Sequence, residues 1–264
     1  MPSEVIPILL TSSIIVHDTG VKLKDEAARL RHAIESIEEW LRIDPRISIV
    51  VCDGSNYDMQ PVLDEKFPQA TIEFLSFQNN QHLVQLHGRG YGEGEIVRHA
   101  IEHSTLIRKA GCFAKCTSKL WVKNFNDCKR WWNGNFLCHG VFKNVFLPHR
   151  PTIFKYIDTR FYIASISFYQ RFFLDAHQAI RTADGHGLEE CFHSILQNQG
   201  LNHVLLPVPP IIEGVGGGTA SYYRNSMKRI WKERLQIALL RSDSRFDNLF
   251  ADGRHITIGP AHYI

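Results

Sequence analysis

The chain has 264 residues, enough to bury one large core, or a core with a small appendage. Hydrophobic residues make up 44% of it and charged residues 22%, the balance of an ordinary soluble globular protein. Thirty basic and 27 acidic residues leave a net charge of +3, too small to indicate nucleic-acid binding. We therefore expect a globular protein with no nucleic-acid partner.

No stretch of the sequence approaches the length needed to cross a bilayer. The apolar run in residues 5–16 is too short, and it lacks the basic flank and cleavage site of a signal peptide. Six cysteines without an export signal are typical of reduced thiols in a cytoplasmic protein. We expect a cytoplasmic location, with any membrane contact peripheral.

Apolar strands and helices alternate over the first half of the chain. Continuous apolar or β-branched runs predict strands at 5–16, 47–56, 71–77 and 113–122. Helical spacing predicts a helix at 24–42, ended by Asp44-Pro45, and another after Gly92. This order predicts an α/β fold with a mostly parallel sheet flanked by helices.

Polar side chains follow the first two of these strands. Ligands bind beyond the carboxyl ends of parallel strands, so we expect Thr11, Ser12 and Ser13 to lie beside Asp53 and Ser55. An Asp-Gly-Ser sequence after a strand also makes an ordinary turn, which is the alternative interpretation.

The second half has a less regular pattern. We expect irregular aromatic structure at 124–150, a strand at 161–169, helices near 170–182 and 187–199, and a short strand at 205–210. A Gly-rich loop at 214–223 and a basic helix at 226–241 follow. Residues 1–264 are predicted to form one domain with a mobile C-terminal segment.

Two Gly-rich segments could approach an anion. GRGYGEGE (88–95) is neither a dinucleotide fingerprint nor a Walker loop, but its glycines allow close approach and the following helix offers N–H groups. Glu93 and Glu95 are expected in the first helical turn, where capping is an alternative role. GVGGGTASYY (214–223) could fold over a diphosphate, or act as a flexible linker.

Glu189 and Glu190 lie at a predicted helix start, after a Gly-containing turn. A carboxylate that projects from such a position into a cleft can act as a general base, and helix capping is the alternative. The pattern His99-x-x-Glu102-His103 matches an inverted zinc-protease motif, but nothing singles out a third ligand. The cysteines do not form paired zinc knuckles.

The order of these motifs resembles that of bacterial GT-A-like glycosyltransferases of capsule and O-antigen synthesis. A strand ends in Cys-Asp-Gly-Ser-Asn (52–56), and GRGYGEGE and a helix follow it. FAKCTSKLWVKN (113–124) is similar to the family's F-x-K-x-T-G-R-x-x-x-x-N. GVGGGTASYY lies where relatives carry G-x-S-G-T-x-G-x-x-Y, so the resemblance spans residues 5–223.

The resemblance implies a GT-A-like fold with a Rossmann-type nucleotide-binding half. It implies transfer of a hexosyl or deoxyhexosyl group from a nucleotide-sugar to a growing surface polysaccharide or lipid-linked oligosaccharide, with inversion. It also divides the domain into a nucleotide-sugar-binding half (1–122), an acceptor and catalytic half (123–212) and the C-terminal segment (213–264).

The resemblance further implies roles for individual residues. Glu189 or Glu190 would deprotonate the acceptor hydroxyl, and Lys119 would lie at the centre of the donor site. Thr11, Ser12, Asp53 and Ser55 would contact base and ribose, with Ser13 beside them. The remaining donor-binding residues would be Gly88, Arg89, Gly90, Glu93, Lys115, Thr117, Gly217, Gly218, Thr219 and Tyr223.

One departure from the family concerns metal. The Asp-x-Asp motif should lie near 113–119, where this chain has Thr117-Ser118-Lys119. A divalent ion would normally neutralise the leaving diphosphate, so cationic and hydrogen-bonding groups must do so here. We expect no metal and no cofactor, with Lys119, Arg89, Arg224 and the late Gly-rich loop in that role. Three other carboxylates could still hold an ion: Asp58, Asp127 and Asp184.

Two other classes remain open. A nucleotidyltransferase that makes the activated sugar usually has a Gly-rich signature with Lys or Arg after its first strand, and TSSIIVHD (11–18) has none. A non-catalytic nucleotide- or polysaccharide-binding module is the second class. The basic helix at 226–241, with Trp231, could dock on anionic lipid at the inner face of the plasma membrane, or be a solvated face.

Overall fold

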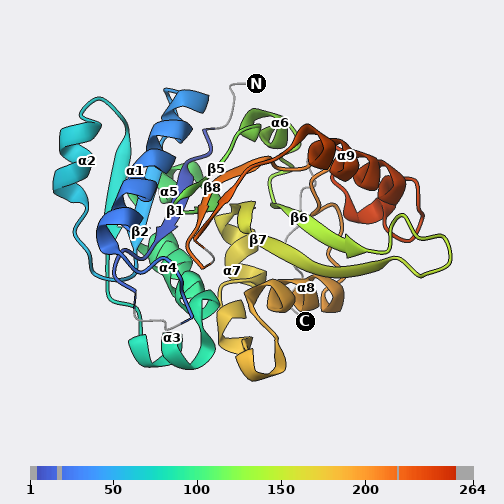
Figure 1. Cartoon of the computed structure of the whole chain (residues 1–264). Helices are drawn as coiled ribbons and strands as arrows, with labels where there is room; N and C mark the ends of the chain where they lie inside the picture. The colour runs from blue at the N-terminus through green and yellow to red at the C-terminus, as the bar shows by residue number, and fades with distance from the viewer. Residues whose placement is uncertain (1–4, 17–19, 219, 254–264) are drawn as a thin grey trace, which may run out of the picture.

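A six-stranded sheet forms the centre of the computed structural model, which describes residues 5–16, 20–218 and 220–253 (Figure 1). Its strand order is β3-β2-β1-β4-β7-β6. The first four of these strands are parallel, and β7 runs antiparallel to both β4 and β6. The predicted mostly parallel sheet is therefore confirmed. The bounds are β1 Ile8–Ser12, β2 Ile49–Asp53, β3 Ile72–Ser76, β4 Cys112–Thr117, β6 Phe136–Lys143 and β7 Ile153–Ser165.

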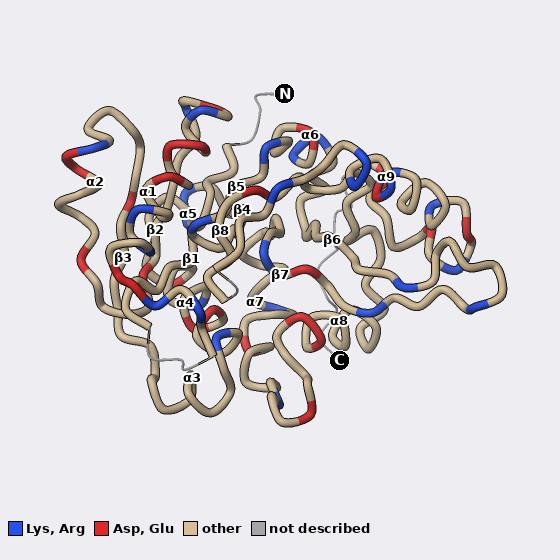
Figure 2. Tube along the Cα trace, viewed as in Figure 1, with Lys and Arg blue, Asp and Glu red and all other residues tan. Residues whose placement is uncertain are grey.

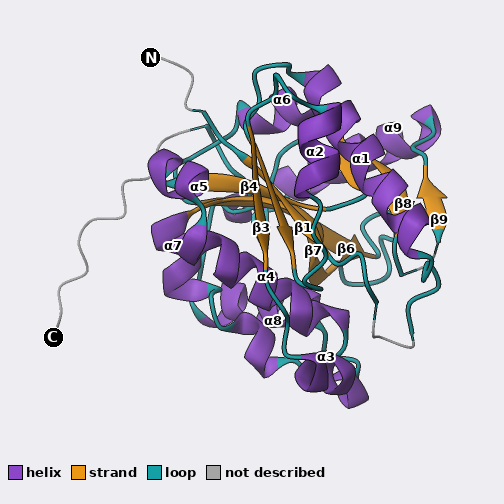
Figure 3. Cartoon of the chain, turned by 90° about the vertical axis from the view of Figure 1, so that its left-hand side faces the viewer, coloured by secondary structure: helices purple, strands orange, loops and turns teal. Residues whose placement is uncertain are grey.

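Helices cover both faces of this sheet (Figure 3). Alternate strand residues such as Ile8 and Leu9 point to opposite faces, so the sheet separates two apolar clusters. One cluster contains residues of α1, α2 and α6, and the other contains residues of α4, α5, α7, α8 and α9. The helices are α1 Glu26–Ile43, α2 Gln60–Lys66, α3 Gln81–His87, α4 Arg89–His103, α5 Thr105–Ala110, α6 Phe125–Lys129, α7 Ile166–Phe172, α8 Leu188–Asn198 and α9 Met227–Arg241.

A second, three-stranded antiparallel sheet corrects two predictions. It consists of β5 Leu120–Val122, β8 Ile212–Gly216 and β9 Ser221–Tyr223. Residues 113–122 are not one strand, because the chain turns between β4 and β5 with Lys119 at φ 95°. GVGGGTASYY is not one loop, because it supplies both strands of the β8–β9 hairpin.

The helix predicted to follow Gly92 begins earlier, so the loop expected at the start of GRGYGEGE is wrong from Arg89 onward. α4 begins at Arg89, and its first turn contains no acidic residue. Glu93 and Glu95 lie after that turn. The glycines serve close packing instead, since a Cβ atom on Gly94 would overlap the side chain of His177. The sequence shows glycines but not the neighbour that requires them.

We expect Gly94→Ala to destabilise the fold although alanine favours helices. The overlap with buried His177 should cost about 1–3 kcal/mol, more than the ~1 kcal/mol gained in helix propensity. Urea unfolding measures the change. A variant as stable as the wild type would show that the α4–His177 contact is not tight.

Two further predictions fail in the second half of the chain. β6 lies inside the segment expected to be irregular, where pairing with β7 orders it. Residues 205–210 form no strand, because three prolines remove donors and only Leu205 makes isolated bridges. The helix at 226–241 is confirmed as α9. No helix in the described ranges is both long enough and apolar enough to span a membrane.

Candidate functional site

A cavity of about 640 Å³ opens at the carboxyl ends of β1, β2 and β4, where parallel sheets bind ligands. It brings together most of the residues predicted for the site. These are Thr11, Ser12, Ser13, Ser55, Gly88, Arg89, Gly90, Glu93, Thr117, Lys119, Glu189, Gly217, Gly218 and Tyr223. Thr219 lies outside the described residues.

Asp53 was predicted to contact the ligand, but it is fully buried and is not among the cavity-lining residues. Its Oδ1 accepts hydrogen bonds from the backbone N–H and hydroxyl of Ser55, at 2.8 and 2.6 Å. Its Oδ2 accepts from the N–H of Ile14 at 3.0 Å. Asp53 thus fixes the turn that presents Ser55, as the turn interpretation predicts.

Several buried polar atoms on the lining residues lack a partner. Thr11 Oγ1, Ser12 Oγ and Asn79 Oδ1 make no hydrogen bond within the described parts of the chain. A buried polar atom without a partner costs about 1–3 kcal/mol. A polar ligand in the cavity would supply the partners that these atoms lack.

Three cations converge on the β8–β9 turn at the same cavity. An added Cβ on Gly217 would lie 3.2 Å from Lys119 Cε and 3.4 Å from Arg29 Nη1. Gly218 lies directly against the guanidinium of Arg89. Within the described ranges none of the three makes an ion pair with a carboxylate. The cluster of Arg29, Arg89 and Lys119, called here the cation cluster, therefore suits an anion.

Arg29 and Lys119 carry their charge at an electrostatic cost. The pKa of Lys119 is lowered to about 7, chiefly by burial and also by the charge of Arg29, while Asp53 opposes the shift. Burial also lowers the pKa of Arg29 to about 10, and Asp53 again opposes it. The Arg29 guanidinium donates to the carbonyls of Ser13 and Leu23, which hold it in place. A bound anion would raise the pKa of both side chains and so favour their charged forms.

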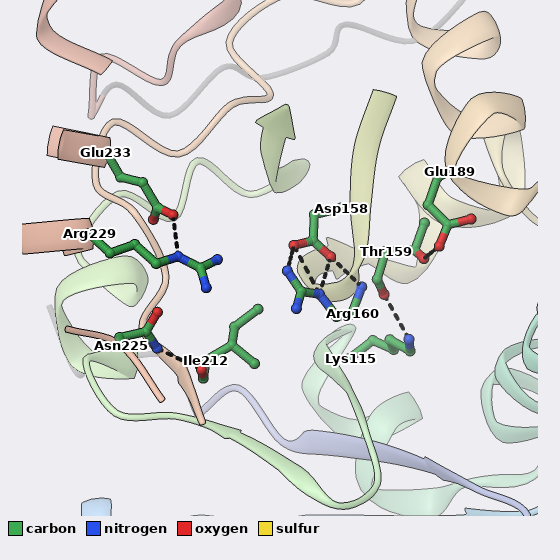
Figure 4. Close-up of polar contacts among 9 residues, drawn as sticks. All are labelled: Lys115, Asp158, Thr159, Arg160, Glu189, Ile212, Asn225, Arg229 and Glu233. Atoms are coloured by element: carbon green, nitrogen blue, oxygen red, sulfur yellow. Dashed lines mark hydrogen bonds and ion pairs between the residues drawn. The ribbon is translucent and has the colours of Figure 1, made fainter. Parts of the chain in front are cut away.

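A bulge in β7 places two consecutive side chains at the cavity. Cys138 pairs with Tyr162 and the next residue, His139, pairs with Asp158, so three residues of β7 have no counterpart on β6. Thr159 and Arg160 consequently both line the cavity, which regular alternation would forbid. Asp158 fixes Arg160, whose Nε lies 2.9 Å from Oδ1 (Figure 4).

Asp158 is a buried acid that stays ionised. Burial would raise its pKa, but the hydrogen bonds and charge of Arg160 outweigh burial and lower it. Arg160 in turn packs over the ring of Tyr223, with 5.1 Å between its Cζ and the ring centroid. The charge of Arg160 is therefore balanced by Asp158, and its side chain forms part of the cavity wall.

A chain of polar contacts links the two carboxylates of the cavity, Glu93 and Glu189. Lys115 is fully buried, with its Nζ 2.7 Å from Glu93 Oε1 and 2.7 Å from the carbonyl oxygen of Thr159. The Thr159 hydroxyl donates to Glu189 Oε1 at 3.3 Å (Figure 4). Lys115, predicted at the donor site, thus lies behind the lining residues and neutralises Glu93.

Glu189 has the properties of a proton acceptor. Burial raises its pKa, as do the charges of Glu93, Glu190 and Asp158, while a backbone hydrogen bond lowers it. A carboxylate with a raised pKa and access to a cavity is suited to general base chemistry. Glu190, the other candidate, is absent from the cavity lining, and its Oε2 accepts from the N–H of Gly187 at 3.0 Å. Glu190 therefore caps α8.

The residues of the cavity do not fit a divalent metal ion. No group of three His, Cys, Asp or Glu side chains suited to an ion occurs in the described part of the chain. The position of the expected Asp-x-Asp motif is occupied by Thr117, Ser118 and Lys119, which offer no carboxylate to a hard cation. Asp58, Asp127 and Asp184 are not among the lining residues.

The zinc-protease pattern on α4 has a packing role. The rings of His99 and His103 stack with centroids 4.1 Å apart, and His99 also stacks on Phe77. His103 Nδ1 lies 2.9 Å from the His99 carbonyl oxygen. Stacked rings do not converge on one ion, and no third ligand joins them in the described ranges.

Sequence reasoning missed Arg29, Asn79, Thr159 and Arg160. Arg29 lies near the start of α1, the helix that follows β1. A basic residue at this position could have indicated that it lies at the ligand-binding edge of the sheet. The role of Thr159 and Arg160 depends on the β7 bulge, which leaves no local pattern in the sequence.

No protein-family model matches the sequence, and no curated protein matches it. Among solved structures, a putative nucleotide-diphospho-sugar transferase from Desulfovibrio desulfuricans is 10% identical, with a TM-score of 0.46 over 75% of this chain and 78% of that chain. The galactosyltransferase LgtC, in complex with donor and acceptor sugar analogues, is 7% identical, with a TM-score of 0.44 over 72% and 70%. A 4-diphosphocytidyl-2C-methyl-D-erythritol synthase is 10% identical, with a TM-score of 0.40 over 88% and 98%. Similarity at this level leaves the activity to be inferred from the cavity itself.

Proposed function

We propose that the protein is a glycosyltransferase that moves a sugar from a nucleotide-sugar donor to a glycan or lipid-linked acceptor of a bacterial surface polysaccharide. The observation that carries the proposal is one cavity with the cation cluster on one side and Glu189 on another. Cations that pair with no carboxylate in the described part of the chain suit a diphosphate, and a carboxylate with a raised pKa suits an acceptor hydroxyl.

The reaction needs one bond to form and one to break. The acceptor oxygen bonds to the anomeric carbon, while the bond from that carbon to the diphosphate oxygen breaks and its electron pair leaves with the nucleotide. Glu189 takes the proton of the acceptor hydroxyl. Arg29, Arg89 and Lys119 stabilise the negative charge that develops on the leaving diphosphate. Attack opposite the leaving group inverts the anomeric centre.

The polar edge of the cavity suits the nucleoside. Thr11, Ser12 and Asn79 offer buried polar atoms with no partner among the described residues, which a base or ribose can satisfy. The backbone at Ser55 and the glycines at Gly88 and Gly90 border the same space. Donor selectivity then depends on hydrogen bonds that a wrong base would leave unmade.

We expect nucleoside diphosphates to bind without metal. Binding to the native state raises the melting temperature, so a screen of UDP, GDP, dTDP and CMP, each with EDTA or with Mg²⁺ or Mn²⁺, measures it. One nucleotide should give an equal shift under all three conditions, because the cation cluster replaces the ion. A shift that vanishes in EDTA would contradict metal independence, and no shift with any nucleotide would contradict the proposed function.

The released product separates the alternative nucleotidyltransferase. Such an enzyme would bind a nucleoside triphosphate with a sugar phosphate and release pyrophosphate, whereas a glycosyltransferase releases the nucleoside diphosphate. Detecting the released product by phosphorus NMR distinguishes the two. A module that binds nucleotide but releases neither product would be non-catalytic.

A further inference from the structure

An exposed apolar stripe runs along α9 on the side opposite its buried residues. Ile237 and Leu240 face the core, whereas four large apolar side chains recur every fourth residue at the surface. Their exposed fractions are 68% for Met227, 63% for Trp231, 55% for Leu235 and 42% for Leu239. Single exposed apolar residues are ordinary, but an ordered stripe of four marks an interaction surface.

The β6–β7 hairpin adds to this surface. Its tip and second strand expose Phe146, Leu147 and Ile153. The hairpin lies beside α9, because Lys232 Nζ is 5.8 Å from the ring centroid of Phe146 and the Gln236 amide donates to the carbonyl of Phe142 at 3.5 Å. The α9 stripe and the exposed apolar residues of the neighbouring hairpin are together called here the apolar patch.

Positive charge surrounds the apolar patch. α9 contains five basic residues and one acidic residue, Glu233, which pairs with Arg229. At 3.6 residues per turn, Lys228 and Lys232 flank one side of the stripe and Arg234 flanks the other. The hairpin segment 143–155 holds three basic residues and no acidic ones. Figure 2 shows these basic residues along α9 and the hairpin.

We infer that the apolar patch docks on an anionic lipid surface. Apolar side chains that include a tryptophan, bordered by lysine and arginine, match the acyl–headgroup boundary of a membrane in both polarity and charge. A protein partner or a second copy would need a matching acidic rim, and the patch itself is basic. Each basic residue near an anionic leaflet adds attraction, which salt weakens.

The position of the patch gives this contact a use, which rests on the proposed function. Tyr223 lines the cavity and α9 begins four residues later, a length of chain that spans at most about 14 Å. The side chain of Asn225 also ties the start of α9 to the carbonyl of Ile212 in β8. Docking therefore places the donor cavity near the lipid surface, within reach of an acceptor carried on a lipid.

Vesicle flotation of the full chain tests the inference. Binding should be seen with phosphatidylcholine–phosphatidylglycerol vesicles, be weak with phosphatidylcholine alone, and fall as salt rises. Trp231→Ser/Leu235→Ser and Lys228→Glu/Lys232→Glu should each reduce binding roughly tenfold or more. Matched controls are Val5→Ser and Lys66→Glu/Lys109→Glu, which change exposed residues away from the patch and should bind like the wild type.

Three outcomes would overturn the inference. They are no binding to anionic vesicles, patch variants that bind like the wild type, and patch variants that alter only the oligomeric mass. The thermal shift with nucleotide keeps the test separate from the proposed function. Patch variants that retain this shift are folded, and vesicle binding without any nucleotide shift would remove the proposed function alone.

Discussion

Glu189→Gln should lower kcat by about 10² to 10⁴-fold while nucleotide binding stays intact. The amide keeps the shape of the side chain, and its carbonyl oxygen can still accept the Thr159 hydroxyl, but it cannot take a proton. The loss should therefore appear in kcat, with the melting-temperature shift by nucleotide unchanged. Steady-state transfer assays and the thermal-shift screen measure the two effects.

Glu190→Gln is the matched control for this variant. Glu190 is the adjacent carboxylate, but its oxygen caps the N–H of Gly187, which a glutamine oxygen can also do. We expect near wild-type kcat and at most a small change in stability. Equal losses in both variants would show that the two carboxylates act as a unit, and a loss only in Glu190→Gln would reverse the assignment.

The pH profile tests the same assignment in another way. Burial and three neighbouring carboxylates raise the pKa of Glu189, so its basic form is populated only above that raised value. The acidic limb of kcat against pH should thus lie higher than for an ordinary glutamate, and Glu189→Gln should abolish it. Replacing Glu93 by Gln removes one raising charge and should move the limb to lower pH in whatever activity remains.

Local sequence pattern was sufficient for the β1 and β2 side of the sheet. β1, β2 and α1 have strong apolar periodicity, and the rule that parallel strands bind ligands at their carboxyl ends placed Ser13 and Ser55 at the cavity. These features depend on residues that are close together along the chain, so a single sequence is enough to predict them.

Features that depend on distant partners could not be predicted. The glycines of α4 favour a loop in the local sequence pattern. Their packing role becomes visible only in the fold, where the side chain of His177 lies against Gly94. Glu189 and Glu190 are adjacent glutamates that the sequence alone cannot tell apart. The structure assigns them different roles, because Glu190 accepts the N–H of Gly187 and only Glu189 lines the cavity. Arg160 reaches the cavity through a bulge that register with β6 creates.

Lys119→Met should weaken nucleoside diphosphate binding by at least about tenfold, because a charged hydrogen-bond donor contributes about 1.5–3 kcal/mol. The same variant should be more stable than the wild type at low pH. The pKa of Lys119 is about 7 when folded and ordinary when unfolded, so the unfolded chain binds more protons between these values. The free energy of unfolding of the wild type therefore rises with pH above 7.

Methionine removes that dependence, so its advantage should be on the order of a few kcal/mol below pH 7 and shrink as pH rises toward 10. Urea unfolding at several pH values measures this, and Lys123→Met, a change at an exposed lysine, is the control. Equal pH dependence in Lys119→Met and wild type would contradict a low pKa for Lys119.

Nucleotide binding should consequently take up a proton above pH 7. Free Lys119 is then largely neutral, and a bound diphosphate raises its pKa, so the charged form returns on binding. Affinity should fall as pH rises, and calorimetry in buffers of different ionisation enthalpy counts the proton. Lys119→Met should lose the uptake. If the variant retains it, another group of the cavity charges on binding, and Lys119 is not the group that takes up the proton.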